Sequence, residues 1–595
     1  MLLKNWVLAI AVVLIIASLG QAQAPIAATG IPINHQLTID KCQGCHPRDA
    51  NGMMRRISYI RTTPEVWEQA IKRMIRLNGM VLKPEEAREI LRYLSNNNGL
   101  APEEAKVSFW EAEHRLFRDQ SDKIPDEALQ HTCNYCHTIG RVLNQRRTKD
   151  DYEKLINMHL GLFPGAENTL RPRRPTGPQP EVPAAFIAPT GGNPAVVPPP
   201  NNNPIALRAD GRDPADVAID YLSKAQPLMT PEWVAWKSVM RSPKLEGKWM
   251  LTGYQQGKGR IFGTLTIEAG PTADDFVTKL DIDYATTGAT VSRTGKGIVY
   301  TGYSWRGRSN SGTAAPTDPS AAPTEWREAM MVSRDGNSMD GRWFWGGYEE
   351  FGMDAHLVRI GTTPMLSGVN TFALQSPSTS DIKVYGANFG TDLKAADFDL
   401  GAGITVTRVT RNSPSVATIT VQVAPNLPSA IRDISLSRST VERAIAVYDK
   451  IAYIKTIPDA NMARLGGVVA AKQYAQFEAI AYAAGPDGKA GTVDDIPLGP
   501  VAARWSLEEF LSTPDDDDVR FVGAINQTTG MFTPNIEGPN PERKKQSNNY
   551  GTNNYGDVWV DAEYTPPGGK PMKARSYLVV TIPSYIRYDQ PEVSK

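Results

Sequence analysis

The sequence predicts a multidomain protein of the α plus all-β class. An α-helical N-terminal domain comes first, and three antiparallel β barrel or sandwich (immunoglobulin-like) domains follow it. The 595 residues are enough for about three to five domains. Helical patterns fill the chain to about residue 240, and beyond it short runs of β-forming residues alternate with Gly, Pro, Asp and Asn. With 41% apolar and 22% charged residues, the composition is that of ordinary folded domains.

The overall charge and hydropathy exclude two classes of function. Lys and Arg together number 64, and so do Asp and Glu, so the formal net charge is zero. A nucleic-acid-binding protein would show a basic excess or a basic stripe, so we expect no nucleic-acid partner. The mean hydropathy of −0.35 excludes a polytopic membrane protein.

The first residues have the order of an export signal. Lys4 precedes an apolar run from Trp6 to Leu19, and an A-x-A site at Ala22 and Ala24 follows. The run is shorter than the roughly 20 residues that span a bilayer as a helix. The alternative is an uncleaved membrane anchor. We therefore expect residues 1–24 to be a cleaved signal peptide, and the mature protein to be exported without stable membrane insertion.

All four cysteines belong to two C-x-x-C-H motifs, at residues 42–46 and 133–137. This is the attachment signature of c-type haem: two thiols one helical turn apart can add to the two vinyl groups of one haem, and the next His faces the iron. A zinc site of four cysteines is the alternative, but it leaves the His after each pair unexplained. The sequence predicts two covalent haems, with these thiols as the attachment points: Cys42, Cys45, Cys133 and Cys136.

His46 and His137 are then the proximal iron ligands. Similar segments after the two motifs indicate an internal duplication, and aligning Trp67 with Tyr152 puts Met74 opposite His159. Both lie seven residues after the aromatic residue, on the same helical face. A Met sulfur or an imidazole nitrogen can complete a low-spin haem iron, so we predict Met74 and His159 as the distal ligands. Two six-coordinate irons would bind no substrate, and the domain would only transfer electrons.

Other residues compete for the distal positions. Met80 is the alternative to Met74, and an isolated Met is otherwise a core filler. The alternatives to His159 are His35, His114 and His131. Ligation by Met raises the potential of a c-type haem, so the two haems are expected to differ in potential.

The helical domain is expected to span residues 25–240. Pro84, with acidic residues directly after it, marks a helix start, and the triplet Tyr93-Leu94-Ser95 near the end of that helix recurs as Tyr221-Leu222-Ser223. Between the two copies lies a Pro-rich insertion, residues 164–213, of extended type.

Three β domains are expected at residues 241–361, 362–448 and 449–595. About seven strands in the first fit an antiparallel barrel or sandwich, with Trp343–Trp345 in its core and a hairpin turn at Asp335–Asn337. The predicted strands are Trp249–Tyr254, Arg260–Glu268, Phe276–Tyr284, Gly297–Tyr303, Glu328–Ser333, Gly341–Trp345 and Ala355–Ile360.

The second β domain alternates like an immunoglobulin-like module and has a G-x-N-F turn at Gly386–Phe389. In the third, the acidic run Asp515–Asp518 is interpreted as a solvated loop. The segment Asp487–Asp495 has oxygen ligands and glycines but lacks the spacing of an EF-hand, which leaves calcium binding open. None of these domains shows a nucleophile elbow, P-loop, HExxH or Rossmann motif.

The order of these features resembles the alpha subunit of quinohemoprotein amine dehydrogenase. The resemblance is carried by the two C-x-x-C-H motifs, the Trp67–Met74 segment, the Pro-rich insertion and the order of the β units. It implies a periplasmic heterotrimer with a seven-bladed β-propeller subunit and a small subunit. The small subunit carries cysteine tryptophylquinone, which oxidises primary amines to aldehyde and ammonia.

The resemblance further implies that this chain takes electrons from the quinone and passes them to a soluble copper protein or a cytochrome c. It implies no amine-oxidising or other catalytic residue here, and the β domains would dock the partner subunits. Three other functions are a free-standing exported dihaem carrier with β binding domains, a dihaem peroxidase and a structural surface protein. Copurifying subunits would argue against the first, and low-spin irons against the second.

Overall fold

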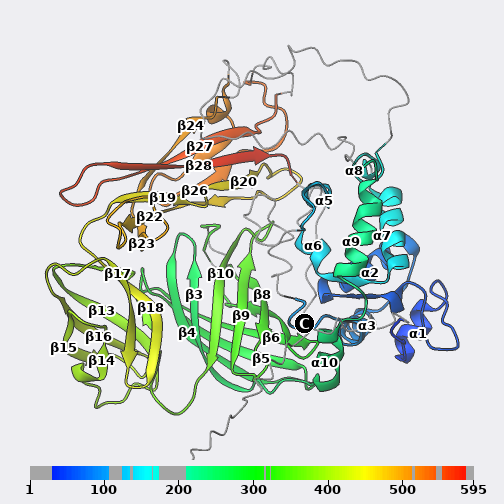
Figure 1. Ribbon diagram of the computed structural model, residues 1–595, viewed down its shortest axis with the longest axis horizontal. Helices are drawn as coiled ribbons and strands as arrows, with labels where there is room; N and C mark the ends of the chain where they lie inside the picture. The colour runs from blue at the N-terminus through cyan, green and yellow to red at the C-terminus, as the bar shows by residue number, and fades with distance from the viewer. Residues whose placement is uncertain are drawn as a thin grey trace, which may run out of the picture.

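The computed structural model describes residues 30–105, 124–133, 139–163, 165–172, 210–313, 317–321, 323–511, 516–543 and 552–583. It has a helical domain followed by three mainly antiparallel β domains, and the fold class predicted from the sequence is confirmed. Figure 1 shows a β-barrel between the helical domain and a β-sandwich, with the C-terminal β domain lying across the barrel and the sandwich. Within the described ranges, no helix combines the length and the apolar character that crossing a membrane requires. The predicted signal peptide, residues 1–24, and most of the Pro-rich insertion lie outside those ranges.

The helical domain is built from short helices whose starts follow local rules. Proline occupies the first helical turn at Pro64, Pro84, Pro214 and Pro231, where its missing N–H costs no hydrogen bond. The elements are α1 (Gln36–Cys42), η1 (Ile57–Tyr59), β1 (Ile60–Thr62), α2 (Pro64–Asn78), α3 (Pro84–Asn97), α5 (Glu127–Cys133), α6 (Gly140–Leu143), β2 (Gln145–Arg147), α7 (Lys149–Leu162), α8 (Ala166–Leu170), α9 (Pro214–Ala225) and α10 (Pro231–Val239).

Two halves of this domain are related by an approximate two-fold axis. Both α1 and α5 end at the first cysteine of a C-x-x-C-H motif. Strands β1 and β2, one from each half, pair antiparallel with Arg61 opposite Arg146 at the centre. The flanking pairs, Ile60 with Arg147 and Thr62 with Gln145, exchange under the alignment that matches Trp67 to Tyr152. The axis therefore passes through the Arg61–Arg146 pair.

The long helices keep this symmetry in their hydrogen bonds. Trp67 of α2 donates its indole N–H to the Asn98 carbonyl at 3.2 Å, just after α3. Tyr152 of α7 donates its hydroxyl to the Gln226 carbonyl at 3.0 Å, just after α9. The same two carbonyls accept from the last residues of β1 and β2, Thr62 and Arg147. The internal duplication predicted from the sequence is confirmed by these equivalent contacts.

The first β domain is a closed eight-stranded barrel. Its interior is filled by aromatic residues, including Trp249, Trp305 and Trp343, and α10 adds Trp233 and Trp236 to the same core. The expected core position is confirmed for Trp343 and Trp345. It is wrong for Phe344, because alternate residues of a strand point to opposite faces, and Phe344 packs outside the barrel against Val66 of α2. The turn at Asp335–Asn337 joins two neighbouring strands. The strands are β3 (Gly247–Gln255), β4 (Gly259–Ala269), β5 (Asp275–Tyr284), β6 (Thr290–Tyr300), β7 (Ser304–Asn310), β8 (Glu325–Val332), β9 (Ser338–Trp345) and β10 (Phe351–Arg359).

One strand of the barrel was not predicted. The predicted run Gly297–Tyr303 covers the end of β6 and the following turn, where Thr301 has a φ of 56°. Strand β7 begins at Ser304, and its sequence is too polar to indicate a buried strand. Its Arg306 is buried because it forms an ion pair with Glu65 of α2. The contact between the barrel and the helical domain therefore explains why β7 is polar, and why its hydrophobic periodicity did not indicate a strand.

The second β domain is a sandwich of two four-stranded sheets, β11-β13-β16-β15 and β12-β18-β17-β14. In the predicted G-x-N-F turn, Asn388 has a φ of 57° and donates to the carbonyls of Gly361 and Thr363. Phe389 then enters the core. The strands are β11 (Met365–Val369), β12 (Ala373–Gln375), β13 (Ser378–Ala387), β14 (Phe398–Asp399), β15 (Ile404–Arg411), β16 (Val416–Val423), β17 (Ala430–Leu436) and β18 (Ser439–Tyr448).

The C-terminal β domain contains three small sheets around one core. The interpretation of Asp515–Asp518 as a solvated loop is wrong for Asp518, which is 5% exposed, pairs with Arg543 and accepts a bond from the Asp557 N–H. The strands are β19 (Tyr453–Ile457), β20 (Ala460–Arg464), β21 (Ala475–Gln476), β22 (Glu478–Ala483), β23 (Ile496–Val501), β24 (Arg504–Glu509), β25 (Gly523–Ile525), β26 (Met531–Pro534), β27 (Gly556–Tyr564) and β28 (Met572–Thr581).

Candidate haem centres

The first C-x-x-C-H motif begins at the end of α1. Cys42 is half-buried and packs against the core of the first half, whereas Cys45 is exposed. The backbone stays helical through the motif, because the His46 N–H donates to the Cys42 carbonyl at 2.9 Å. Burial raises the pKa of the Cys42 thiol to about 11, and Cys45 adds to the shift. A thiol with such a pKa is protonated and is no redox-active thiolate at neutral pH.

The imidazole of His46 is held in one orientation. Its Nδ1 lies 3.0 Å from the Arg55 carbonyl oxygen, which can only accept, so Nδ1 carries the proton and Nε2 keeps its lone pair. Burial lowers the pKa of His46, with Arg56 and Arg55 contributing, so the ring stays neutral. A neutral ring whose other nitrogen is fixed by a backbone carbonyl is the usual arrangement of a metal-ligating histidine.

The two methionine candidates of the first half lie in different surroundings. Met80 packs against the same core as Cys42. Met74 lies near the end of α2, where its sulfur accepts from the Asn78 side chain at 3.7 Å, and it is not part of that core. Met80 directly follows the left-handed Gly79 that ends α2. The packing therefore favours Met80, although both residues remain candidates.

The second candidate haem site, around the motif at residues 133–137, is only partly within the described residues. Cys133 ends α5 and packs against the core of the second half, and burial raises the pKa of its thiol to about 12. Cys136 and His137 lie outside the described residues. None of the three described cysteines forms a disulfide. The first cysteines of the two motifs, Cys42 and Cys133, therefore occupy equivalent places at the ends of equivalent helices.

His159 of α7 repeats the arrangement of His46. Its Nδ1 lies 2.9 Å from the Leu155 carbonyl, which leaves Nε2 for a ligand. Burial lowers its pKa, and three arginines add to the effect: Arg141, Arg147 and Arg73. Both features suit the distal ligand role predicted for it.

The structure also bears on the other histidine candidates. Both ring nitrogens of His35 have protein partners, Thr38 at 2.9 Å and Glu89 at 3.1 Å, and the ring stacks on Tyr93. His35 is therefore poorly placed to bind iron. His114 and the side chain of His131 lie outside the described residues.

The described residues of the first half fit a haem. They combine two thiols one helical turn apart, a neutral imidazole with a free Nε2 and a thioether packed on the same core. Large apolar side chains near Met80 are exposed, with Leu77 at 66% and Val81 at 83%. An apolar macrocycle would give such side chains a partner, and this donor set is that of a c-type haem.

The acidic clusters do not form comparable sites. In the described ranges, the one group of His, Cys, Asp or Glu atoms close enough to hold an ion is Glu509, Asp516 and Asp518. Glu509 already accepts from two backbone amides, and Asp518 pairs with Arg543. In the Asp487–Asp495 segment the carboxylates likewise bind backbone amides of the loop.

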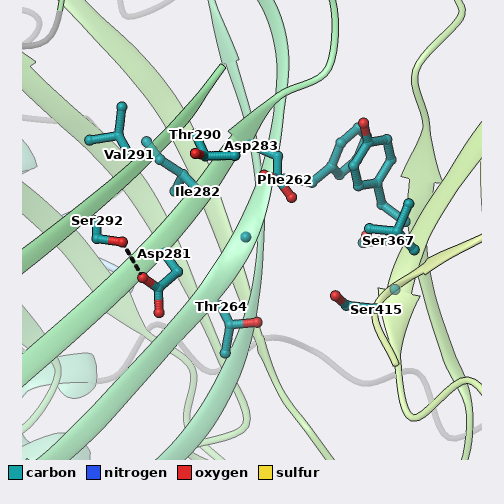
Figure 2. A pocket seen from close by; sticks show the side chains of 14 residues that line it. Phe262, Thr264, Asp281, Ile282, Asp283, Thr290, Val291, Ser292, Ser367 and Ser415 are labelled. Atoms are coloured by element: carbon teal, nitrogen blue, oxygen red, sulfur yellow. Dashed lines mark hydrogen bonds between the residues drawn. The ribbon is translucent and has the colours of Figure 1, made fainter. Parts of the chain in front are cut away.

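Two pockets lie where the barrel meets the sandwich, and neither contains a predicted site residue. Figure 2 shows the smaller, of about 240 Å³, with Asp281 and Ser292 on the barrel side and Ser367 and Ser415 on the sandwich side. The larger, of about 520 Å³, is bordered by the His356–Asp340 ion pair. Both contain side chains of the two domains, as expected at a joint between them.

The sequence interpretation missed one buried charge cluster at the centre of the helical domain. Arg61 and Glu104 form an ion pair with side chains 0% and 4% exposed, and Arg146 joins it. A signal for it was present, because the alignment of Trp67 with Tyr152 also matches Arg61 with Arg146. A charged residue repeated in the middle of two short strands is a candidate for pairing across an axis.

Comparison with known proteins identifies the family. Sequence models of the quinohemoprotein amine dehydrogenase alpha subunit match four consecutive parts of the chain: haem binding at residues 33–174, domain II at 242–360, domain III at 364–449 and domain IV at 454–593. No curated protein matches the chain.

Several solved structures resemble parts of the chain, at scores too low to support any conclusion. A redesigned β-barrel is 13% identical over 20% of this chain and 92% of its own, with a TM-score of 0.16. Human protocadherin-24 EC1-2 is 11% identical over 39% and 100%, with a TM-score of 0.14. SGBP-B of a Bacteroides ovatus mixed-linkage glucan utilization locus, in complex with a heptasaccharide, is 10% identical over 58% and 65%, with a TM-score of 0.17.

The four family matches cover most of the chain, in the order of the four domains of the fold. They include the C-x-x-C-H motifs at Cys42 and Cys133, the helices that carry Met74 and His159, and Met80 just after α2. The N-terminal part is therefore a haem-binding domain, and the chain works with partner subunits in an oxidoreductase complex. This protein belongs to the family of quinohemoprotein amine dehydrogenase alpha subunits.

Proposed function

We propose that the chain is the dihaem electron-transfer subunit of a periplasmic quinohemoprotein amine dehydrogenase. In this proposal it takes electrons from cysteine tryptophylquinone on a small partner subunit, with a β-propeller subunit completing the heterotrimer. It passes the electrons to a soluble copper protein or a cytochrome c. The proposal is based mainly on the approximate two-fold symmetry of the helical domain. In each half, a C-x-x-C-H motif begins at the end of the corresponding helix, α1 in the first and α5 in the second.

The two halves suit the electron count of the reaction. A primary amine and water give an aldehyde, ammonia, two protons and two electrons, whereas a haem iron carries one electron at a time. A chain with two haem sites can take up both electrons in turn. Cys42 and Cys45 would hold one haem and Cys133 and Cys136 the other, so no cysteine remains in this chain for a quinone crosslink.

Axial ligation explains why the domain would transfer electrons and bind no substrate. His46 and His137 are the proposed proximal ligands. Met74 or Met80 would supply the second protein ligand of the haem held by His46, and His159 would supply that of the haem held by His137. The fixed Nδ1 bonds of His46 and His159 orient each Nε2 in advance, which limits rearrangement when the charge on the iron changes.

The test uses the protein purified natively from periplasm with its copurifying subunits. A primary amine is added anaerobically and the haem absorption is recorded. We expect the ferrous c-type α band to grow, and a small quinone-bearing chain to be present. Recovery of the mature chain from periplasm, lacking residues 1–24, would support the proposed export.

Two other results would contradict the proposal. Haems that stay ferric with several amines but reduce with dithionite, in a protein without partners, would indicate a free-standing dihaem carrier. A high-spin ferric spectrum that changes on adding peroxide would indicate an open iron position and a peroxidase. A matched control adds a tertiary amine, which cannot undergo the same conversion to aldehyde and ammonia.

A further inference from the structure

The buried cluster of Arg61, Glu104 and Arg146 lies on the approximate two-fold axis of the helical domain. Arg61 and Arg146 face each other at the centre of the β1–β2 pair, so both side chains lie on the same face of this small sheet. Any point on a two-fold axis has the same relation to corresponding points of both halves. A charge placed there acts on the two haem-binding halves alike.

Glu104 joins the two arginines into one unit. Its carboxylate accepts from the Arg61 guanidinium at 2.7 and 2.8 Å, and Arg146 Nε lies 3.2 Å away. The Thr230 hydroxyl and the Ala101 N–H complete its shell, each at 2.8 Å. Burial opposes the charge of Glu104, but the two arginines outweigh burial and lower the pKa of the carboxyl. One carboxylate between two guanidinium groups leaves the cluster with a net charge of one positive unit.

The burial of this cluster gives its charge a long reach. The side chains of Arg61, Glu104 and Arg146 are 0%, 4% and 10% exposed. Charges away from water are screened less than surface charges, so their field extends into both halves. Replacing such a cluster by apolar residues is often neutral or favourable for stability, which makes a purely stabilising role a weak explanation.

We propose that the Arg61–Glu104–Arg146 cluster is a shared electrostatic centre that sets the reduction potentials of both haems together. This rests on the proposed function, since it needs one haem in each half. The axial ligands would then determine the difference between the two potentials. The cluster would determine their common level, and so the ease of accepting electrons from the quinone, without changing the direction of transfer between the haems.

The test is a potentiometric titration of the native complex with Glu104→Gln, which keeps the shape of the side chain and removes one negative charge. Added positive charge favours the ferrous state, so both midpoint potentials should rise. Both reduction equilibrium constants should increase several-fold and by the same factor. The matched control is Glu103→Gln, which removes the same charge from an exposed pair with Arg334 on the barrel, off the axis.

A second variant keeps the test valid if Glu104→Gln does not fold. Arg146→Gln removes one positive charge from the cluster, and both potentials should then fall together. The inference is overturned if only one midpoint potential shifts, or if neither potential shifts more than it does in the Glu103→Gln control. Fewer than two haems in the wild-type chain would instead overturn the proposed function. Two haems with unequal shifts would overturn this inference alone.

Discussion

His46 and His159 show the same local design, although they lie in different halves and different helical contexts. Each has Nδ1 on a backbone carbonyl and no partner for Nε2 among the residues that the structure describes, and burial lowers the pKa of each. His46 and the cysteines could be predicted from the sequence because their spacing is set by the chemistry of haem attachment, whereas His159 was predicted from the internal repeat. The choice between Met74 and Met80 could not, because both lie within reach along the chain and packing decides between them.

A pair of substitutions separates the two methionines. Met80→Leu should abolish the sulfur-to-iron charge-transfer band of the ferric protein and lower one haem potential, because a Met ligand raises the potential. Met74→Leu should leave both unchanged, since this swap keeps volume and apolar character. Absorption spectroscopy and potentiometry of the two variants measure this. The opposite result would establish Met74 as the ligand.

Glu350 should make stability depend on pH. It precedes β10 and accepts from the backbone N–H of Tyr474 in the C-terminal domain, and burial raises its pKa to about 7. A carboxyl whose folded pKa is raised loses stability as pH rises from the unfolded value near 4.5 to the folded value. At pH 8, Glu350→Gln should therefore be more stable than wild type by about 3 kcal/mol and unfold at a higher temperature. At pH 4 the two proteins should be equally stable. A variant less stable than wild type at pH 8 would contradict this assignment.

At the scale of elements, the internal duplication gives α2 and α7 equivalent hydrogen bonds. The duplication itself was visible in the sequence as matched aromatic residues and the repeated Tyr-Leu-Ser triplet. The two-fold pairing of β1 with β2 was not, because three-residue strands carry no periodicity. Strand β7 could not be predicted either, because its polar sequence hides a buried position. Arg306 is buried through its pairing with Glu65, and a local sequence pattern does not reveal a partner 241 residues away.

The equivalence of α2 and α7 predicts that two substitutions each loosen one half of the domain. Trp67→Phe and Tyr152→Phe each remove one hydrogen bond, to the carbonyls of Asn98 and Gln226. Each loss should destabilise its own half by about 1–2 kcal/mol, because the buried carbonyl loses a donor. Hydrogen exchange of α2 and α7, read by mass spectrometry, measures the local opening. If exchange instead increased in α7 of Trp67→Phe, or in α2 of Tyr152→Phe, these bonds would not hold the helices that contain them.

At the scale of the whole molecule, the helical domain is fixed to the barrel by buried polar contacts. Glu65 of α2 pairs with Arg306 of β7, and Ile298 and Tyr300 of β6 join the core of the first half. The order and type of the domains followed from the sequence, since helical and strand periodicities differ. Their mutual contacts did not, because these depend on pairs of residues far apart in the chain.

Breaking the Glu65–Arg306 pair should loosen the helical domain from the barrel. Arg306→Met leaves a carboxylate buried without its partner, and such a loss typically costs about 3–5 kcal/mol. Limited proteolysis should then cut between α10 and β3 faster than in wild type. The control is Arg334→Gln, which breaks an exposed pair worth about 0–1 kcal/mol. Equal cleavage rates in the two variants would show that the buried pair does not hold this interface.

The central claim is that two equivalent halves of one domain each carry a covalent haem. The most direct test is the intact mass of the denatured, purified chain, followed by mapping of its haem-bearing peptides. We predict a mass increase of two haems, one on the peptide with Cys42 and Cys45 and one on the peptide with Cys133 and Cys136. A chain with one haem or none after denaturation would contradict it.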